Sequence, residues 1–226
     1  MRLKRTLAVI LSLAAGALLP LSPAQAQAQD ANLLVKHWTR ATGSDGITRT
    51  TEYSERVYRR ASQLWIERVL PAGAHSVAEH DKAGADHRHI DASTAARWIS
   101  READGTLRVR LVPPHDSVVV EVTKTDYANI GFDGSWDAAW HLMDPAALKR
   151  LERHAPNGDL VRYDAKSAEQ AIEVVWSQRG GHPMSVLSTA GLTQRKTTVQ
   201  AIAEPKVAPW DQLGKLNRKD YSDYLD

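Results

Sequence analysis

The chain of 226 residues contains no cysteine. This absence excludes thiol nucleophiles, thiolate metal ligands and cysteine redox motifs. The sequence also has no G-x-S-x-G or H-E-x-x-H motif and no glycine loop of the kind that cradles phosphates. Beyond the first thirty residues, no apolar run approaches the length that crosses a bilayer. We therefore expect a non-enzymatic protein without a transmembrane anchor.

Residues 1–28 have the three parts of a secretory signal peptide. Three basic residues open the chain, residues 6–19 are apolar, and "AQA" triplets supply the small residues that signal peptidases need. Cleavage is expected after Ala26 or Ala28. No cysteine follows, so a lipid-anchored mature form is excluded. The sequence predicts export to a bacterial periplasm.

Removal of the signal also removes the apparent positive charge. The chain has 29 basic and 27 acidic residues, and three of the basic ones lie in the signal, which leaves 26 basic against 27 acidic residues. The charge of a nearly neutral mature chain does not indicate an anionic polymer or an anionic membrane as a partner. We therefore expect no binding to nucleic acid.

Alternating apolar residues predict a sheet-dominated domain over residues 29–205. The clearest case is "TLRVRLV" (106–112), where Leu107, Val109 and Leu111 point to one side and polar residues to the other. "RGGHP" separates two further runs and indicates a hairpin. The expected strands are 47–60, 62–71, 106–112, 116–124, 169–178, 184–190 and 193–202.

Two helices are predicted in this domain and one in the tail. Residues 30–43 have Leu34, Trp38 and Ala41 at helical spacing. Residues 144–154 begin with Asp144 as N-cap and Pro145 at the first position. In the tail, residues 206–226, apolar residues three apart predict a short docking helix. The fold class is thus α+β, a large curved antiparallel sheet (a half-barrel) with an N-terminal helix and an inserted helix.

Seven tryptophans are distributed along the chain. Trp136 and Trp140 are four residues apart, so we expect them to pack on one face of a helix, with ligand contact as the alternative. The tryptophans at 65, 98 and 176 are expected in the core, or around a cavity if the core is hollow.

The order of these elements resembles a known family. It runs from the signal and the expected amphipathic helix through strand pairs ending in "QLWIERVLP" to "AARWISREADGTLRVRLV", an inserted helix and "AIEVVWSQRGGHPMSVLSTA". This is similar to the periplasmic outer-membrane lipoprotein carrier family over most of residues 30–205. The resemblance implies a half-barrel whose hollow face, lidded by helices, holds acyl chains.

The resemblance and the strand pattern together suggest a function. We expect an exported carrier that holds an apolar or lipidated ligand, a lipid or a lipidated protein, on a concave sheet. The expected ligand-binding residues are apolar residues of the strands 62–71 and 106–112, together with Trp98 between them. They are Leu64, Trp65, Ile66, Trp98, Leu107, Val109 and Leu111.

The segment 75–91 suggests an alternative, a periplasmic metal-binding protein. If residues 87–91 are extended, His87, His89 and Asp91 project from one side, and His80 could complete the set. Imidazole with carboxylate suits Zn or Cu(II). The full expected metal set is His75, His80, His87, His89 and Asp91. Two other interpretations stay open: a solvated surface loop and a pH-dependent interaction surface.

Overall fold

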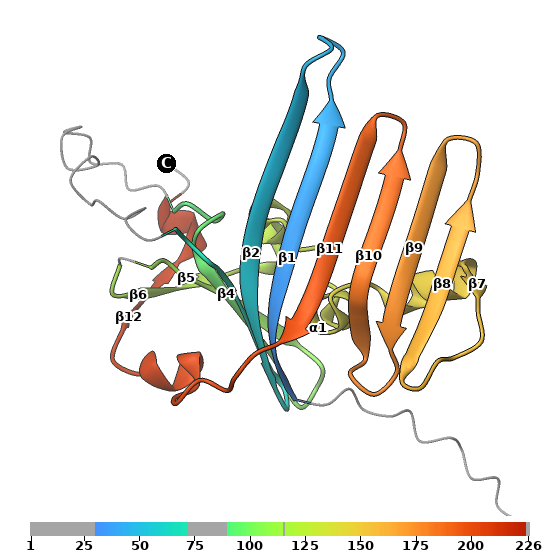
Figure 1. Cartoon of the computed structure of the whole chain (residues 1–226). Coiled ribbons are helices and arrows are strands. Elements are labelled where there is room, and N and C mark those ends of the chain that lie inside the picture. Colours follow the sequence, from blue (N-terminus) through green and yellow to red (C-terminus); the bar gives the residue numbers. More distant parts are fainter. Residues whose placement is uncertain (1–29, 72–89, 115, 225–226) are drawn as a thin grey trace, which may run out of the picture.

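The computed structural model describes residues 30–71, 90–114 and 116–224. Within these residues, twelve strands join in one open sheet in the order β12-β6-β5-β4-β3-β2-β1-β11-β10-β9-β8-β7 (Figure 1). Neighbouring strands are antiparallel except β12, which runs parallel to β6. The strands are β1 Ala31–Thr42, β2 Thr48–Arg60, β3 Gln63–Arg68, β4 Ala96–Arg101, β5 Leu107–Val112, β6 Val118–Val122, β7 Glu152–Arg153, β8 Leu160–Lys166, β9 Gln170–Ser177, β10 His182–Ala190, β11 Thr193–Ala201 and β12 Asn217–Asp220. The predicted α+β fold with a large curved antiparallel sheet is confirmed.

The predicted N-terminal helix is wrong, because residues 31–42 form β1. This strand pairs along its length with β2 on one side and β11 on the other. Leu33 and Val35, two residues apart, are each 2% exposed, as a strand packed on one face requires. Pairing with two long partners outweighs the helical spacing of the apolar residues.

Helical segments in the described residues are short. They are η2 Lys124–Ile130, α1 Trp136–His141, η3 Pro145–Arg150, η4 Pro209–Gln212 and η5 Tyr221–Tyr224, where η marks a 3-10 helix. The N-cap expected at Asp144 is present, because its Oδ1 accepts a 2.9 Å hydrogen bond from the Ala146 amide. The inserted helix is shorter than predicted, since Leu151 is extended and the next two residues join the sheet as β7.

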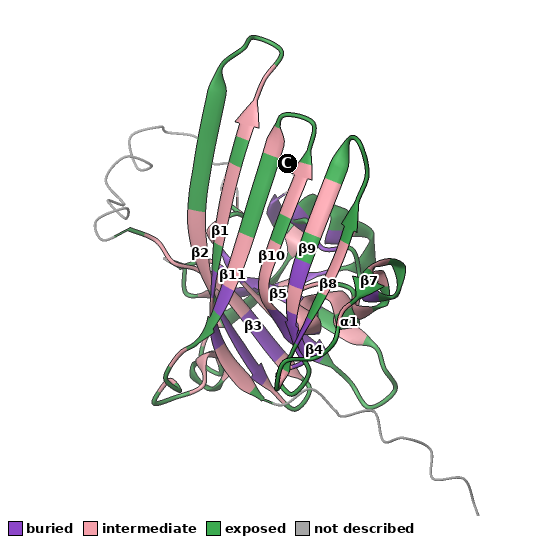
Figure 2. Cartoon of the chain, turned by 45° about the vertical axis from the view of Figure 1, so that its right-hand side comes forward, coloured by how far each residue is buried: buried purple, intermediate pink, exposed green. Residues whose placement is uncertain are grey.

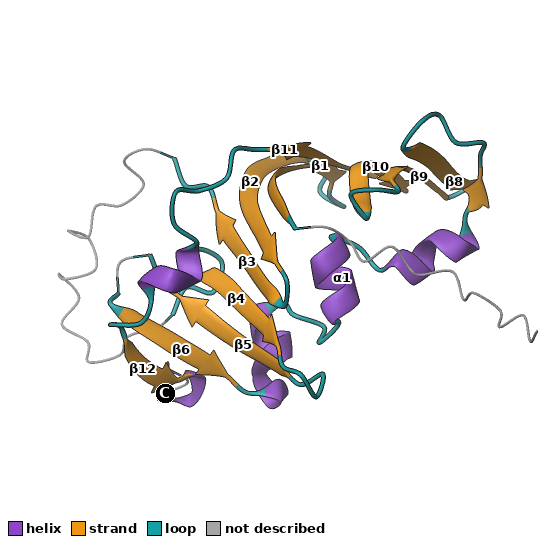
Figure 3. Ribbon diagram, turned by 90° about the horizontal axis from the view of Figure 1, so that it is seen from below, coloured by secondary structure: helices purple, strands orange, loops and turns teal. Residues whose placement is uncertain are grey.

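The sheet bends so that α1 lies in its inner angle (Figure 3). We call the face that contacts α1 the inner face and the opposite one the outer face. On the inner face, Val57, Leu64, Ile99 and Val109 pack beneath residues of η2 and α1 in one buried cluster. On the outer face, residues of the C-terminal tail, namely Trp210, Leu213 and Leu216, pack against Tyr58, Trp65 and Val119.

A third buried cluster continues the inner face toward β8. Leu148 of η3 packs there against Val174 and Trp176 of β9. The buried residues gather at one end of the strands, whereas the far ends of β1, β2 and β11 are exposed or half-buried (Figure 2). The packed end therefore holds the fold, and the far ends project from it.

Candidate functional site

A cleft of about 310 Å³ opens on the inner face, between β2, β3, β4 and the end of η2. Cross-strand pairing brings its residues together: Glu55 lies opposite Arg68, and Ile66 lies opposite Arg97. Residues of the turn before β4 and of η2 close the other side. The full lining is Glu55, Ile66, Arg68, Ala92, Ser93, Ala95, Arg97, Asn129 and Ile130. We call its apolar residues, Ile66, Ala92, Ala95 and Ile130, the floor; the remaining lining residues are polar or charged. This mixed composition suits an amphipathic molecule.

A polar cluster adjoins the cleft on the β1–β2 side through its lining residues Glu55 and Arg68. His37 Nε2 lies 2.9 Å from Glu55 Oε2, and the imidazole stacks on the Tyr53 ring at a centroid distance of 4.5 Å. The Arg68 guanidinium also lies over the Tyr53 ring, 3.9 Å from its centroid. Burial, with the nearby Glu55 charge, raises the pKa of Tyr53, so this phenol stays neutral.

Arg97 forms the opposite wall and ties β4 to η2. Its Nη2 donates a 2.8 Å hydrogen bond to the carbonyl of Ile130, the last residue of η2. Its Nε is buried and has no hydrogen-bond partner among the described residues. Desolvation by burial lowers the pKa of Arg97, and the Glu55 charge offsets part of this effect. Among the described residues, neither Arg97 nor Arg68 forms an ion pair, because no carboxylate oxygen lies within 4.0 Å of its guanidinium nitrogens.

Five of the seven expected ligand-binding residues share the inner face. Ile66 lines the cleft itself. Leu64, Val109 and Leu111 are at most 1% exposed in the core beneath η2 and α1, and Leu107 packs against the edge of that core. The structure thus places Ile66 at the cleft and the other four in or against the inner core.

Trp65 and Trp98 lie on the outer face, away from the other five. Side chains alternate along a strand, so Trp65 points opposite to its neighbours Leu64 and Ile66. A single inner site therefore cannot contain all of the expected residues. The two tryptophans pack instead beneath the C-terminal tail.

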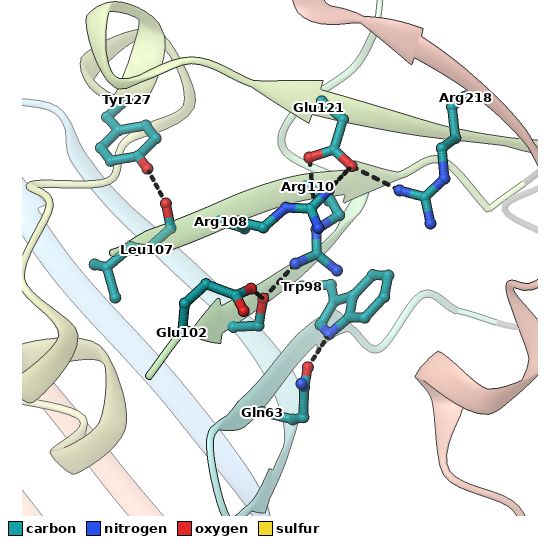
Figure 4. Close-up of polar contacts among 10 residues, drawn as sticks. Gln63, Trp98, Glu102, Leu107, Arg108, Arg110, Glu121, Tyr127 and Arg218 are labelled. Carbon is teal, nitrogen blue, oxygen red and sulfur yellow. Dashed lines mark hydrogen bonds and ion pairs between the residues drawn. The ribbon is translucent and has the colours of Figure 1, made fainter. Parts of the chain in front are cut away.

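The outer face around Trp98 is closed by polar contacts (Figure 4). The Trp98 indole N–H donates to Gln63 Oε1 at 2.6 Å, and the Arg110 guanidinium lies 3.6 Å from the Trp98 ring. Arg218 of β12 donates at 2.7 Å to Glu121 of β6, which fastens the tail to the sheet. Burial lowers the pKa of Arg110 to about 10 despite the Glu121 carboxylate. This network joins β3, β4, β5, β6 and the tail and so supports the fold.

The histidines of the predicted metal set, His75, His80, His87 and His89, lie outside the described residues, so that set stays a prediction. Its fifth member, Asp91, accepts hydrogen bonds from Ser93 and Thr94 and thereby caps the turn before β4. Those contacts lower the pKa of Asp91, led by the Ser93 hydroxyl.

A different group of metal-capable residues occurs on β7 and β8. Potential ligand atoms of Glu152, His154 and Asp164 all lie within 4.8 Å of one another. His154 Nε2 already contacts the Asp164 carboxylate, and Arg162 Nη2 lies 3.3 Å from His154 Nδ1. The guanidinium supplies the positive charge that a cation would bring, so we interpret this group as an ion-pair network.

The sequence pattern missed the charged residues of the cleft, namely Glu55, Arg68 and Arg97, and also His37, which contacts Glu55. Each lies on a strand position whose side chain faces inward, beside apolar neighbours. The signal was an acidic residue, Glu55, two positions before Val57 and a basic residue, Arg68, two positions after Ile66. It becomes visible only with the register of β2 and β3.

No model of a known protein family matches the chain, and no curated protein does. Solved structures do resemble it. A LolA superfamily protein from Nitrosomonas europaea aligns with a TM-score of 0.31 and 8% identity, over 82% of this chain and 90% of that one. A domain described as an outer membrane lipoprotein-sorting protein domain from Vibrio parahaemolyticus gives 0.34 and 9%, over 82% and 90%.

The structure of PNGF-II aligns with a TM-score of 0.36 and 9% identity, over 86% of this chain but only 32% of that one. At these identities the resemblance is one of fold alone. Among the described residues, no helix has the length and the apolar character needed to cross a membrane.

Proposed function

We propose that this protein is an exported, non-enzymatic periplasmic carrier, which holds the acyl chain of a lipid or of a lipidated protein on the inner face of its sheet. The observation that carries the proposal is the cleft of about 310 Å³, whose apolar floor, which includes Ile66, Ala95 and Ile130, adjoins the inner core. This volume lies at the lower end of the range for small-molecule sites. Export rests on the predicted signal peptide, residues 1–28.

The carrier mechanism is burial of apolar surface, worth about 25 cal/mol per Å² removed from water. The cleft receives the first part of a chain. Deeper binding follows displacement of η2, whose Tyr127 and Ile130 cover the inner core. Few polar contacts hold this segment: Tyr127 Oη donates to the Leu107 carbonyl at 3.2 Å, and Arg97 donates to the Ile130 carbonyl. η2 is therefore the segment that moves when a longer chain enters, and Tyr127 and Ile130 are the core residues that move with it.

Substitutions in the cleft floor test the proposal by titration of the mature protein with a fluorescent fatty-acid probe. Ile66→Gln places an amide where the chain should lie, and Ala92→Trp fills the cleft with a ring. We expect each to weaken probe binding by about tenfold or more, since lost burial of 1.4 kcal/mol corresponds to a factor of ten.

Leu187→Gln is the matched control for these two variants. Leu187 is 46% exposed on the outer face, far from the cleft lining. The Leu187→Gln variant should bind the probe with the same affinity as the unaltered protein. The proposal fails if the unaltered chain does not bind the probe, or if both cleft variants bind it with unchanged affinity while their circular dichroism shows a native sheet.

A further inference from the structure

We propose that the cleft selects amphiphiles with an anionic head group, a carboxylate or a phosphate, which Arg97 and Arg68 bind while the chain lies on Ile66. This inference rests on the carrier function proposed above and specifies the chemistry of its ligand. It is argued from the charge, the hydrogen bonds and the burial of the residues that line the cleft.

The cleft lining has an excess of positive charge. Arg68 and Arg97 line it together with one acidic residue, Glu55. The Glu55 carboxylate contacts His37 at 2.9 Å, so part of its capacity as an acceptor is already used. Two guanidinium groups facing one engaged carboxylate make a site that favours an anion.

The other polar groups of the lining are engaged with their own neighbours. The Ser93 hydroxyl donates to Asp91 at 2.6 Å, and the Asn129 amide donates to Asp126 at 3.3 Å. Arg97 has five N–H donors, of which one bonds the Ile130 carbonyl and the buried Nε bonds no described residue. Burial of a partly bonded cation costs stability, and a bound carboxylate or phosphate offsets that cost through charge-assisted hydrogen bonds.

The two buried arginines of the described residues, Arg59 and Arg110, lack this combination. Arg59 is fully buried, but it donates to the carbonyls of Trp140 at 2.7 Å and Gly180 at 3.1 Å. Arg110 stacks on Trp98 beside Glu121. Neither lines the cleft. Arg97 and Arg68 are the arginines that line this cleft, beside Ile66.

Competition experiments with the mature full chain test the inference. Dodecanoate, dodecyl phosphate and dodecanol, which share one chain length, are each titrated against the fluorescent acyl probe. We expect the better of the two anions to displace the probe at a concentration about 10–100-fold lower than dodecanol, the factor that a charge-assisted hydrogen bond contributes. The ranking of dodecanoate against dodecyl phosphate distinguishes a fatty acid from a phospholipid-like head group.

Arg97→Gln and Arg68→Gln should each reduce the ratio of anion to alcohol affinity, and the double variant should abolish it. Arg108→Gln, at an outer-face residue whose side chain is 50% exposed, should leave the ratio unchanged. If Arg97 acted only through its hydrogen bond to η2, its replacement would lower the affinity for all three competitors equally. The ratio of anion to alcohol affinity therefore separates anion binding from a structural role.

Three results would overturn the inference: equal competition by all three compounds, a preference that survives the double variant, or an equal loss in Arg108→Gln. Absence of any probe binding to the unaltered chain contradicts the carrier function itself. The two failures are therefore distinguishable.

Discussion

Leu64→Ala is expected to lower the free energy of unfolding by about 2–5 kcal/mol. Leu64 is 0% exposed in the inner core, where it lies across from Arg59 of β2 and Ile99 of β4. The truncation loses the transfer free energy of the side chain and leaves a cavity that paired strands on both sides cannot collapse. Urea unfolding followed by tryptophan fluorescence measures the effect, as a lower midpoint with an unchanged slope.

Leu192→Ala is the matched control, because it removes the same atoms from a side chain that is 71% exposed. Its effect should stay within about 0.5 kcal/mol of zero. Equal destabilisation by the two variants would mean that Leu64 is not in the core. That result would also contradict the assignment of the inner face.

Trp140→Ala should cost about 3–5 kcal/mol, because it removes the largest side chain that α1 packs on the sheet. Trp140 is 6% exposed, stacks on Trp136 at a centroid distance of 5.0 Å, and has the Arg59 guanidinium 5.4 Å from its ring. Loss of the ring also leaves this buried cation without its aromatic partner.

Trp140→Phe keeps an aromatic ring and should recover more than half of the stability that Trp140→Ala loses. Differential scanning calorimetry of the three proteins gives the comparison. If Trp140→Ala melted within a degree or two of the unaltered chain, α1 would not be packed as the structure shows.

Local alternation predicted much of the sheet. The segment 106–112 was expected as a strand and forms β5, and the runs on either side of "RGGHP" form β9 and β10. The stacked pair Trp136 and Trp140 was likewise visible from their spacing. These features depend on neighbours in the sequence, which is why the sequence showed them.

Features that depend on distant strands were not accessible. Residues 31–42 have apolar spacing that suits a helix, and only pairing with β2 and β11 makes them a strand. The expected ligand set joined Leu64, Trp65 and Ile66, whereas alternation along β3 places Trp65 on the opposite face from the other two. The cleft arises from the register of three strands, which places Arg97 beside Ile66 and Arg68 beside Glu55.

The most direct test of the carrier account is hydrogen–deuterium exchange of the mature chain with and without a saturating acyl ligand. The account predicts slower exchange in peptides that cover residues 66–68, 92–97 and 127–132, which surround the cleft and η2. Peptides covering Trp210–Leu216 on the outer face should exchange equally in both states. Protection of the tail with no change at the cleft would contradict the account, because the ligand would then bind the outer face.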